Sequence, residues 1–218
     1  MKEIFHIPKP IQILLALVTG FILVRTLYTD SVYYLFLFWN LFLAFVPWAI
    51  SAIIARYTES HRGSTTLWIL VVGGLLWLIT FPNAPYLVTD VIHLGHNRLM
   101  PQWYDVILLY VTALVGMLFT FYSLLNIEKA LNIFYSKIKT HVFIGLLILL
   151  SSFGIYVGRF LRWNSWDVFT NPKELLLDIW AIFAHPRLHG EAYAFTFTML
   201  VFIGVSYIAW KIGNKEEK

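Results

Sequence analysis

The sequence contains no cysteine and few charged residues. Without cysteine the chain cannot form disulfides, thiolate metal sites or iron–sulfur clusters, and it has no thiol nucleophile. Charged residues make up 13% of the 218 residues, whereas hydrophobic residues make up 59%. That charged share is about half of the average for soluble domains. The balance excludes a soluble globular domain and indicates an integral membrane protein.

Lysine and arginine outnumber the acidic residues, and the formal net charge is +4. The basic residues are scattered at the ends of hydrophobic runs and form no basic stripe, so no nucleic-acid partner is expected. No haem is expected either. A b-type haem needs two histidines on facing helices, and only His141 touches a hydrophobic run.

Long hydrophobic runs predict an all-α fold, a polytopic bundle of transmembrane helices. Crossing a bilayer core of about 30 Å takes about 20 helical residues, and a helix satisfies all of its own backbone groups within lipid. The predicted spans cover residues 11–29, 32–55, 64–81, 104–125, 141–158 and 192–211. Residues 1–218 are expected to form a single integral membrane domain, with the first span retained as a helix.

Alternate loops differ in their lysine and arginine content. One side of the predicted bundle collects ten of these residues and the other side six. The side richer in positive charge faces the cytoplasm in most membrane proteins. Both termini are therefore expected to be cytoplasmic, and residues 82–103 and 159–191 to lie on the outer face.

Residues 172–184 have the pattern of an amphipathic helix lying along the outer membrane surface. Asn171 suits an N-cap, Pro172 suits the first helical position, and Pro186 follows the end. The predicted apolar face consists of Leu175, Ile179, Ile182 and Phe183. Such a helix buries its apolar face at the boundary between headgroups and acyl chains.

Polar residues collect in the stretch FPNAPYLVTDVIHLGH at 81–96. Pro82 and Pro85 disfavour helix at the residues before them, so a break is expected at the outer end of the third span. Asn83 can supply partners to backbone groups freed by the break. If helix resumes after Pro85, Tyr86, Asp90, His93 and Asn97 form one stripe.

Asp90 and His93 are spaced to meet on that stripe. A carboxylate that orients one imidazole nitrogen raises the basicity of the other, which suits a general base or a metal ligand. Asp105 adds a third outer carboxylate, or only a charge favourable to a helix N-terminus. We predict catalytic roles for Asp90, His93 and Asp105; a metal, if bound, would use Asp90, His93 and His96. The alternative is that these residues simply face interfacial water.

The stretch GRFLRWNSWD carries a second cluster. If helix continues past Gly158, Arg159, Arg162, Trp163 and Trp166 share one face, with Asn164 beside it. Arginine matches phosphate with a planar fork of donors, and tryptophan favours the headgroup zone, so an anionic lipid headgroup is the predicted ligand. The alternatives are ordinary snorkelling and an ion pair from either arginine to Asp90 or Asp105. Arg25, near the end of the first span, is expected to snorkel outward, and Asn40 to find a partner within the bundle.

Four stretches carry a resemblance to a known family: WNLFLAFVPW, FPNAPYLVTDVIHL, WYDVILL and SFGIYVGRFLRWNSWD. In these the chain resembles the bacterial multi-pass proteins grouped as domain of unknown function 1361. The resemblance implies an integral protein of the bacterial cell membrane, without pointing to a substrate, cofactor or reaction. Its motif positions fall on Asn40, Asn83, Pro85, Tyr86, Thr89, Asp90, His93, Asp105, Gly158, Arg159, Arg162, Trp163, Asn164 and Trp166.

The sequence thus predicts a polar site on the extracytoplasmic face that binds or modifies an anionic envelope lipid or a lipid-linked phosphate. The expected ligand-binding residues are Arg159, Arg162, Asn83, Tyr86, Asn164, Trp163 and Trp166. Two other hypotheses stay open. One is a non-catalytic membrane scaffold that docks a partner protein, and the other is a small transporter component.

Overall fold

The computed structural model describes residues 7–61, 63–95 and 99–216. Within these ranges the chain is helical, with short turns and connections and no strand. Six helical segments of the described chain are long and apolar enough to cross a membrane: Lys9–Thr29, Tyr33–Ser60, Thr66–His93, Gln102–Phe134, Lys137–Arg159 and Gly190–Asn214. The predicted all-α fold with six spans is confirmed, and it is the architecture of a multi-pass membrane protein.

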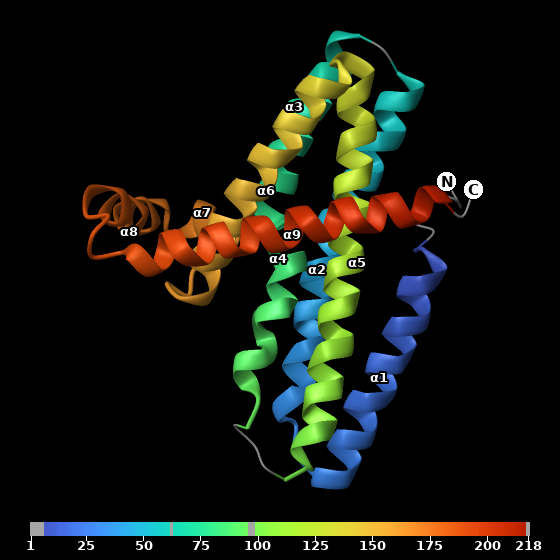
Figure 1. Cartoon of the computed structure of the whole chain (residues 1–218), viewed down its shortest axis with the longest axis vertical. Helices are drawn as coiled ribbons and strands as arrows, with labels where there is room; N and C mark the ends of the chain where they lie inside the picture. Colours follow the sequence, from blue (N-terminus) through green and yellow to red (C-terminus); the bar gives the residue numbers. More distant parts are fainter. Residues whose placement is uncertain (1–6, 62, 96–98, 217–218) are drawn as a thin grey trace. The chain divides into compact units, whose positions relative to one another are not determined.

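The chain consists of two compact units, Met1–Ile133 and Phe134–Lys218. The elements of the first unit are α1 Lys9–Thr29, η1 Tyr33–Leu35, α2 Phe36–Ser60, α3 Ser64–Thr80, α4 Asn83–Tyr86, η2 Leu87–His93 and α5 Gln102–Phe134, the last ending at the boundary (Figure 1). The single domain expected for residues 1–218 stays a prediction.

Apolar side chains from α1, α2, α4, η2 and α5 form the core of the first unit. Ile22, Leu37, Ala84, Leu108 and Phe119 are among its fully buried members. Of the six spans α5 is the most buried, and α2 packs against both α3 and α4. A helix that is apolar all round is suited to this central place, because it can contact neighbours on several sides.

The third span continues past its two prolines, contrary to the predicted end at residue 81. Regular α-helix stops at Thr80, but Phe81 keeps helical angles and its N–H donates to the Trp77 carbonyl at 2.7 Å. Pro82 and Pro85 lack the N–H groups of a normal ladder. The chain compensates by tightening: the Ala84 N–H bonds the Phe81 carbonyl at 3.1 Å, three residues back, and the helical path runs on to His93.

This tightening changes the predicted polar stripe. From Leu87 to His93 the chain is a 3-10 helix, with three residues per turn. Leu87, Asp90 and His93 therefore share one face, and both Leu87 and Asp90 are buried. The α-helical stripe that joined Tyr86 to Asp90 does not form, and Asn97, its last member, lies outside the described residues.

The second unit consists of α6 Lys137–Arg159, α7 Asp167–Thr170, α8 Pro172–Ala184 and α9 Gly190–Glu216. Helices α6 and α9 pack against each other, and a small core of Tyr156, Ile182 and Ala192 joins α8 to both. The Tyr193 hydroxyl adds a hydrogen bond to the Ile182 carbonyl at 3.1 Å.

The bounds of α8 agree with the predicted 172–184, and Asn171 takes the N-cap position without a side-chain hydrogen bond. The apolar face predicted to contact the membrane is divided. Leu175 and Ile182 are buried inside the protein, whereas Phe183 is 55% exposed. Leu176, Leu177 and Trp180 are exposed as well, so the helix has a second apolar face.

Candidate functional site

Polar side chains from several elements of the first unit meet in one place. They come from the end of α1, from η1 and η2, and from the beginnings of α2 and α5. We call this group the polar junction. It consists of Arg25, Tyr33, Tyr34, Asn40, Asp90, His93 and Asp105. Local sequence explains its position: each residue stands within a few residues of the end of a span, where a polar group is least costly in a bilayer protein.

A buried ion pair forms the centre of the junction. The Arg25 guanidinium donates from Nε to Asp105 Oδ1 at 2.7 Å and from Nη2 to Oδ2 at 3.1 Å. Its Cζ lies 4.0 Å from the centroid of the Tyr34 ring, a cation–π contact. Arg25 is fully buried, so the predicted outward snorkelling is wrong. A two-pronged charged hydrogen bond compensates the guanidinium for the loss of water.

Asp90 is fully buried and accepts a hydrogen bond from Asn40. The distance from Asn40 Nδ2 to Asp90 Oδ2 is 2.9 Å, so the amide expected to find a partner within the bundle does so. This bond connects α2 to η2 through two residues that are fifty positions apart in the sequence. The Asp105 carboxylate accepts hydrogen bonds from Arg25 of α1.

His93 contacts the short η1 helix. Its Nδ1 lies 3.3 Å from the Tyr33 hydroxyl, and its carbonyl accepts a bond from the Tyr34 hydroxyl at 3.2 Å. The Phe36 ring packs 4.7 Å from the imidazole, centroid to centroid. Because a hydroxyl can either donate or accept, Tyr33 can support both neutral tautomers of His93.

The second predicted cluster lies in the second unit, on the connection between α6 and α8 at residues 160–171. Helix α6 ends at Arg159, and Arg162 has a left-handed backbone with φ of 62°. The stripe expected from Arg159 to Trp166 therefore does not form. A left-handed residue commonly ends a helix, but glycine usually fills that place, since a side chain costs about 1–2 kcal/mol there.

Side chains of the connection hold its conformation. The backbone N–H of Asn164 donates to Asp167 Oδ2 at 2.7 Å, and the Asn164 side chain adds a bond at 3.2 Å. These bonds, with one from Thr170, lower the pKa of Asp167. The resulting stabilisation is present above the ordinary aspartate pKa and is lost as the pH falls through the lowered value. Trp163 Nε1 donates to Asp178 Oδ2 at 2.8 Å and so attaches the connection to α8.

A family model described as "Protein of unknown function (DUF1361)" matches residues 39–206. The chain belongs to this family. No curated protein and no solved structure matches it. The family match covers the Asn40–Asp90 bond and the whole α6–α8 connection, and it begins after Arg25.

The predicted ligand-binding residues of this DUF1361 member lie in both units. Asn83 and Tyr86, both half-buried, are in α4 of the first unit. The four tryptophan and arginine residues and Asn164 are in the second unit. On the α6–α8 connection, Arg162, Asn164 and Trp166 are exposed, whereas Arg159 and Trp163 are half-buried.

Two tyrosines of the junction, Tyr33 and Tyr34, were not predicted, because aromatic residues at a span end are ordinary interface anchors. Arg25 and Asp105 were each predicted to matter, but their pairing was not. In the parts of the chain that the structure describes, no three His, Cys, Asp or Glu residues lie close enough to hold a metal. His96 lies outside those parts, so the metal set of Asp90, His93 and His96 stays a prediction.

Proposed function

We propose that the protein binds the anionic headgroup of an envelope lipid, or a lipid-linked phosphate, at its α6–α8 connection. The observation that carries the proposal is the conformation of Arg162. The residue is exposed, and its backbone is left-handed although glycine would remove the strain. Strain of this kind is retained mainly where a side chain has a functional task.

The surroundings of Arg162 support a lipid as the ligand. Trp166 is 43% exposed on the same connection, and Leu176, Leu177 and Trp180 give α8 an exposed apolar face. A helix with such a face lies at the boundary between headgroups and acyl chains, and indoles prefer the same depth. The Trp163–Asp178 bond attaches the connection to α8, which favours placing the guanidinium at the level of lipid phosphates.

The positive-inside pattern supports a site on the extracytoplasmic face of a bacterial cell membrane, with both termini in the cytoplasm. Arg159 and Arg162 are the proposed phosphate ligands, and Trp163, Asn164 and Trp166 the supporting residues. The proposal requires no catalytic step. The assignment of Asp90, His93 and Asp105 to catalysis stays a prediction.

Replacing Arg162 with glycine is expected to lower retention of phosphatidylglycerol by at least about ten-fold, since a charged hydrogen bond is worth about 1.5–3 kcal/mol. Glycine accepts the left-handed backbone, so the connection keeps its shape. The measurement is native mass spectrometry of protein released from nanodiscs of mixed phosphatidylglycerol and phosphatidylcholine.

The matched control is Arg187→Ala, which removes the same charge from another exposed site of the second unit. Its lipid retention should equal that of the unaltered protein. Equal retention by the Arg162→Gly protein, or an equal loss in both variants, would contradict the proposal.

A second function is favoured by the polar junction. Its polar and charged residues contact one another inside the first unit, as the Arg25–Asp105 pair and the Asn40–Asp90 bond show. Such contacts suit a non-catalytic scaffold whose helices need fixed positions. The stability of the Arg25 and Asp105 variants, described in the Discussion, tests this alternative.

A further inference from the structure

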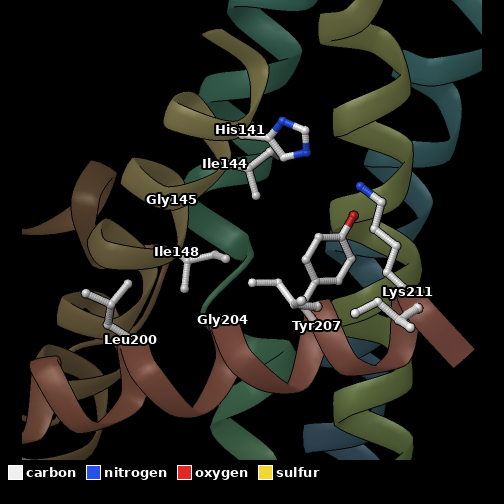
Figure 2. Close-up of a pocket in the computed structure, with 10 residues that line it drawn as sticks. His141, Ile144, Gly145, Ile148, Leu200, Gly204, Tyr207 and Lys211 are labelled. Carbon is white, nitrogen blue, oxygen red and sulfur yellow. The ribbon is translucent and has the colours of Figure 1, made fainter. Parts of the chain in front are cut away.

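A cavity of about 470 Å³ lies between α6 and α9 of the second unit, away from the α6–α8 connection (Figure 2). Ile144, Ile148, Leu200 and Ile208 are among the apolar residues that line it. Its volume is within the range of about 300–1,000 Å³ that is typical of small-molecule sites. We call this cavity the α6–α9 groove.

Two glycines leave the groove open. A methyl group added at Gly145 or Gly204 would meet no atom within 4 Å, and both residues line the groove. Glycine inside a helix costs about 1 kcal/mol relative to alanine. Glycines between spanning helices usually allow close contact of the helices. Here they face open space, so their effect is to widen an apolar groove.

The groove has the length of one membrane leaflet. From Leu200 to Lys211 the α9 helix rises about 16 Å, since each residue adds about 1.5 Å. That is about half of a bilayer core of about 30 Å. The ribbons of α6 and α9 diverge from Ile148 and Leu200 toward His141 and Lys211 (Figure 2).

Polar groups gather at the end where the two helices diverge, and there the side chains of His141, Tyr207 and Lys211 point toward one another (Figure 2). His141 Nδ1 lies 2.6 Å from the Lys137 carbonyl. A carbonyl only accepts, so Nδ1 is the donor in this bond, and the protonated form of the ring can donate from Nε2 as well. The Lys211 ammonium lies 5.7 Å from the centroid of the Tyr207 ring. An apolar groove one leaflet long thus ends in a cationic group.

We propose that the α6–α9 groove binds one acyl chain of an anionic phospholipid, with the lipid phosphate at Lys211 and His141. The chain length matches the apolar walls, and the headgroup charge complements the ammonium. His141 is near the beginning of α6 and Lys211 near the end of α9, so both residues stand near the end of a span. The inference is independent of the proposed function, because it uses none of the residues of the α6–α8 connection.

The test uses phosphatidylglycerol with a photoreactive diazirine in its acyl chain, present in phosphatidylcholine nanodiscs that hold the full chain. Irradiation is expected to label peptides that contain residues 144–148 and 200–208. Gly204→Leu fills the groove, and Gly145→Leu fills it from the other helix. Each is expected to abolish this labelling, and both are made so that a folding defect in one does not decide the result.

Gly213→Leu is the matched control, because it makes the same change on α9 at a glycine that also meets no atom within 4 Å. Its labelling should equal that of the unaltered protein. Unchanged labelling in a folded Gly204→Leu or Gly145→Leu protein would overturn the proposal. So would an equal loss in the Gly213→Leu protein.

A second comparison tests the headgroup. Phosphatidylcholine with the same photoreactive chain is expected to label the groove about five-fold less, the difference typical of one favourable charge near a membrane surface. Replacing Lys211 and His141 together by glutamine should remove this preference while chain labelling persists. Equal labelling by the two lipids in the unaltered protein would overturn the assignment to an anionic lipid.

Discussion

Replacing Arg25 with methionine is expected to destabilise the first unit by about 3–5 kcal/mol, the usual cost of removing one partner of a buried ion pair. Asp105 is 2% exposed and would lose the donors to both of its oxygens. Methionine fills much of the same volume, so packing changes little. The measurement is thermal and denaturant unfolding of the purified protein in detergent.

The double variant Arg25→Met with Asp105→Leu removes both charges and is expected to recover most of that loss, because replacing a whole buried pair by apolar groups is often neutral. Arg56→Met is the control: this exposed arginine of α2 should change stability by less than about 0.5 kcal/mol. If the double variant is as unstable as Arg25→Met, an unpaired carboxylate is not the cause. The scaffold hypothesis would then lose its main support.

Replacing Gly116 with alanine is expected to destabilise the first unit by about 1–3 kcal/mol. A methyl group there would lie 2.5 Å from the Ala84 carbonyl oxygen and 2.9 Å from Leu87 Cβ. The obstacle is backbone of the proline-containing third span, which cannot yield as a flexible side chain can. Either α5 or the α4–η2 segment has to shift, and that segment carries Asp90.

Gly74→Ala in α3 is the matched control. A methyl group at Gly74 would meet no atom within 4 Å, so helix propensity favours alanine there by about 1 kcal/mol. The two substitutions should therefore shift the unfolding midpoint in opposite directions. A Gly116→Ala protein as stable as the Gly74→Ala protein would show that α5 and α4 are not in close contact.

The spans could be predicted from sequence because the bilayer itself sets their length and apolar character. The first was expected at 11–29 and is Lys9–Thr29, and the fifth was expected at 141–158 and is Lys137–Arg159. Hydropathy did not predict the end of α5, which lies at Phe134 rather than near residue 125. Beyond the apolar run the chain stays helical with polar residues, and hydropathy carries no signal for that.

The candidate sites were only partly predictable, for two physical reasons. Arg25 and Asp105 are eighty residues apart, and no periodic pattern connects them. The left-handed backbone of Arg162 has no local signal, because glycine or asparagine normally marks such a position. The sequence did indicate the span ends where polar residues gather, since charges are costly elsewhere in a bilayer.

The proposed lipid site requires the α6–α8 connection to face the extracytoplasmic side of the membrane. The chain has no native cysteine, so single cysteines at Val32, Arg187 and Ser136 can be labelled without background. All three native residues are exposed. In intact bacterial cells, an impermeant maleimide is expected to label the cysteines at 32 and 187, and the one at 136 only after permeabilisation. Labelling at 136 with protection at 187 would contradict an extracytoplasmic lipid site.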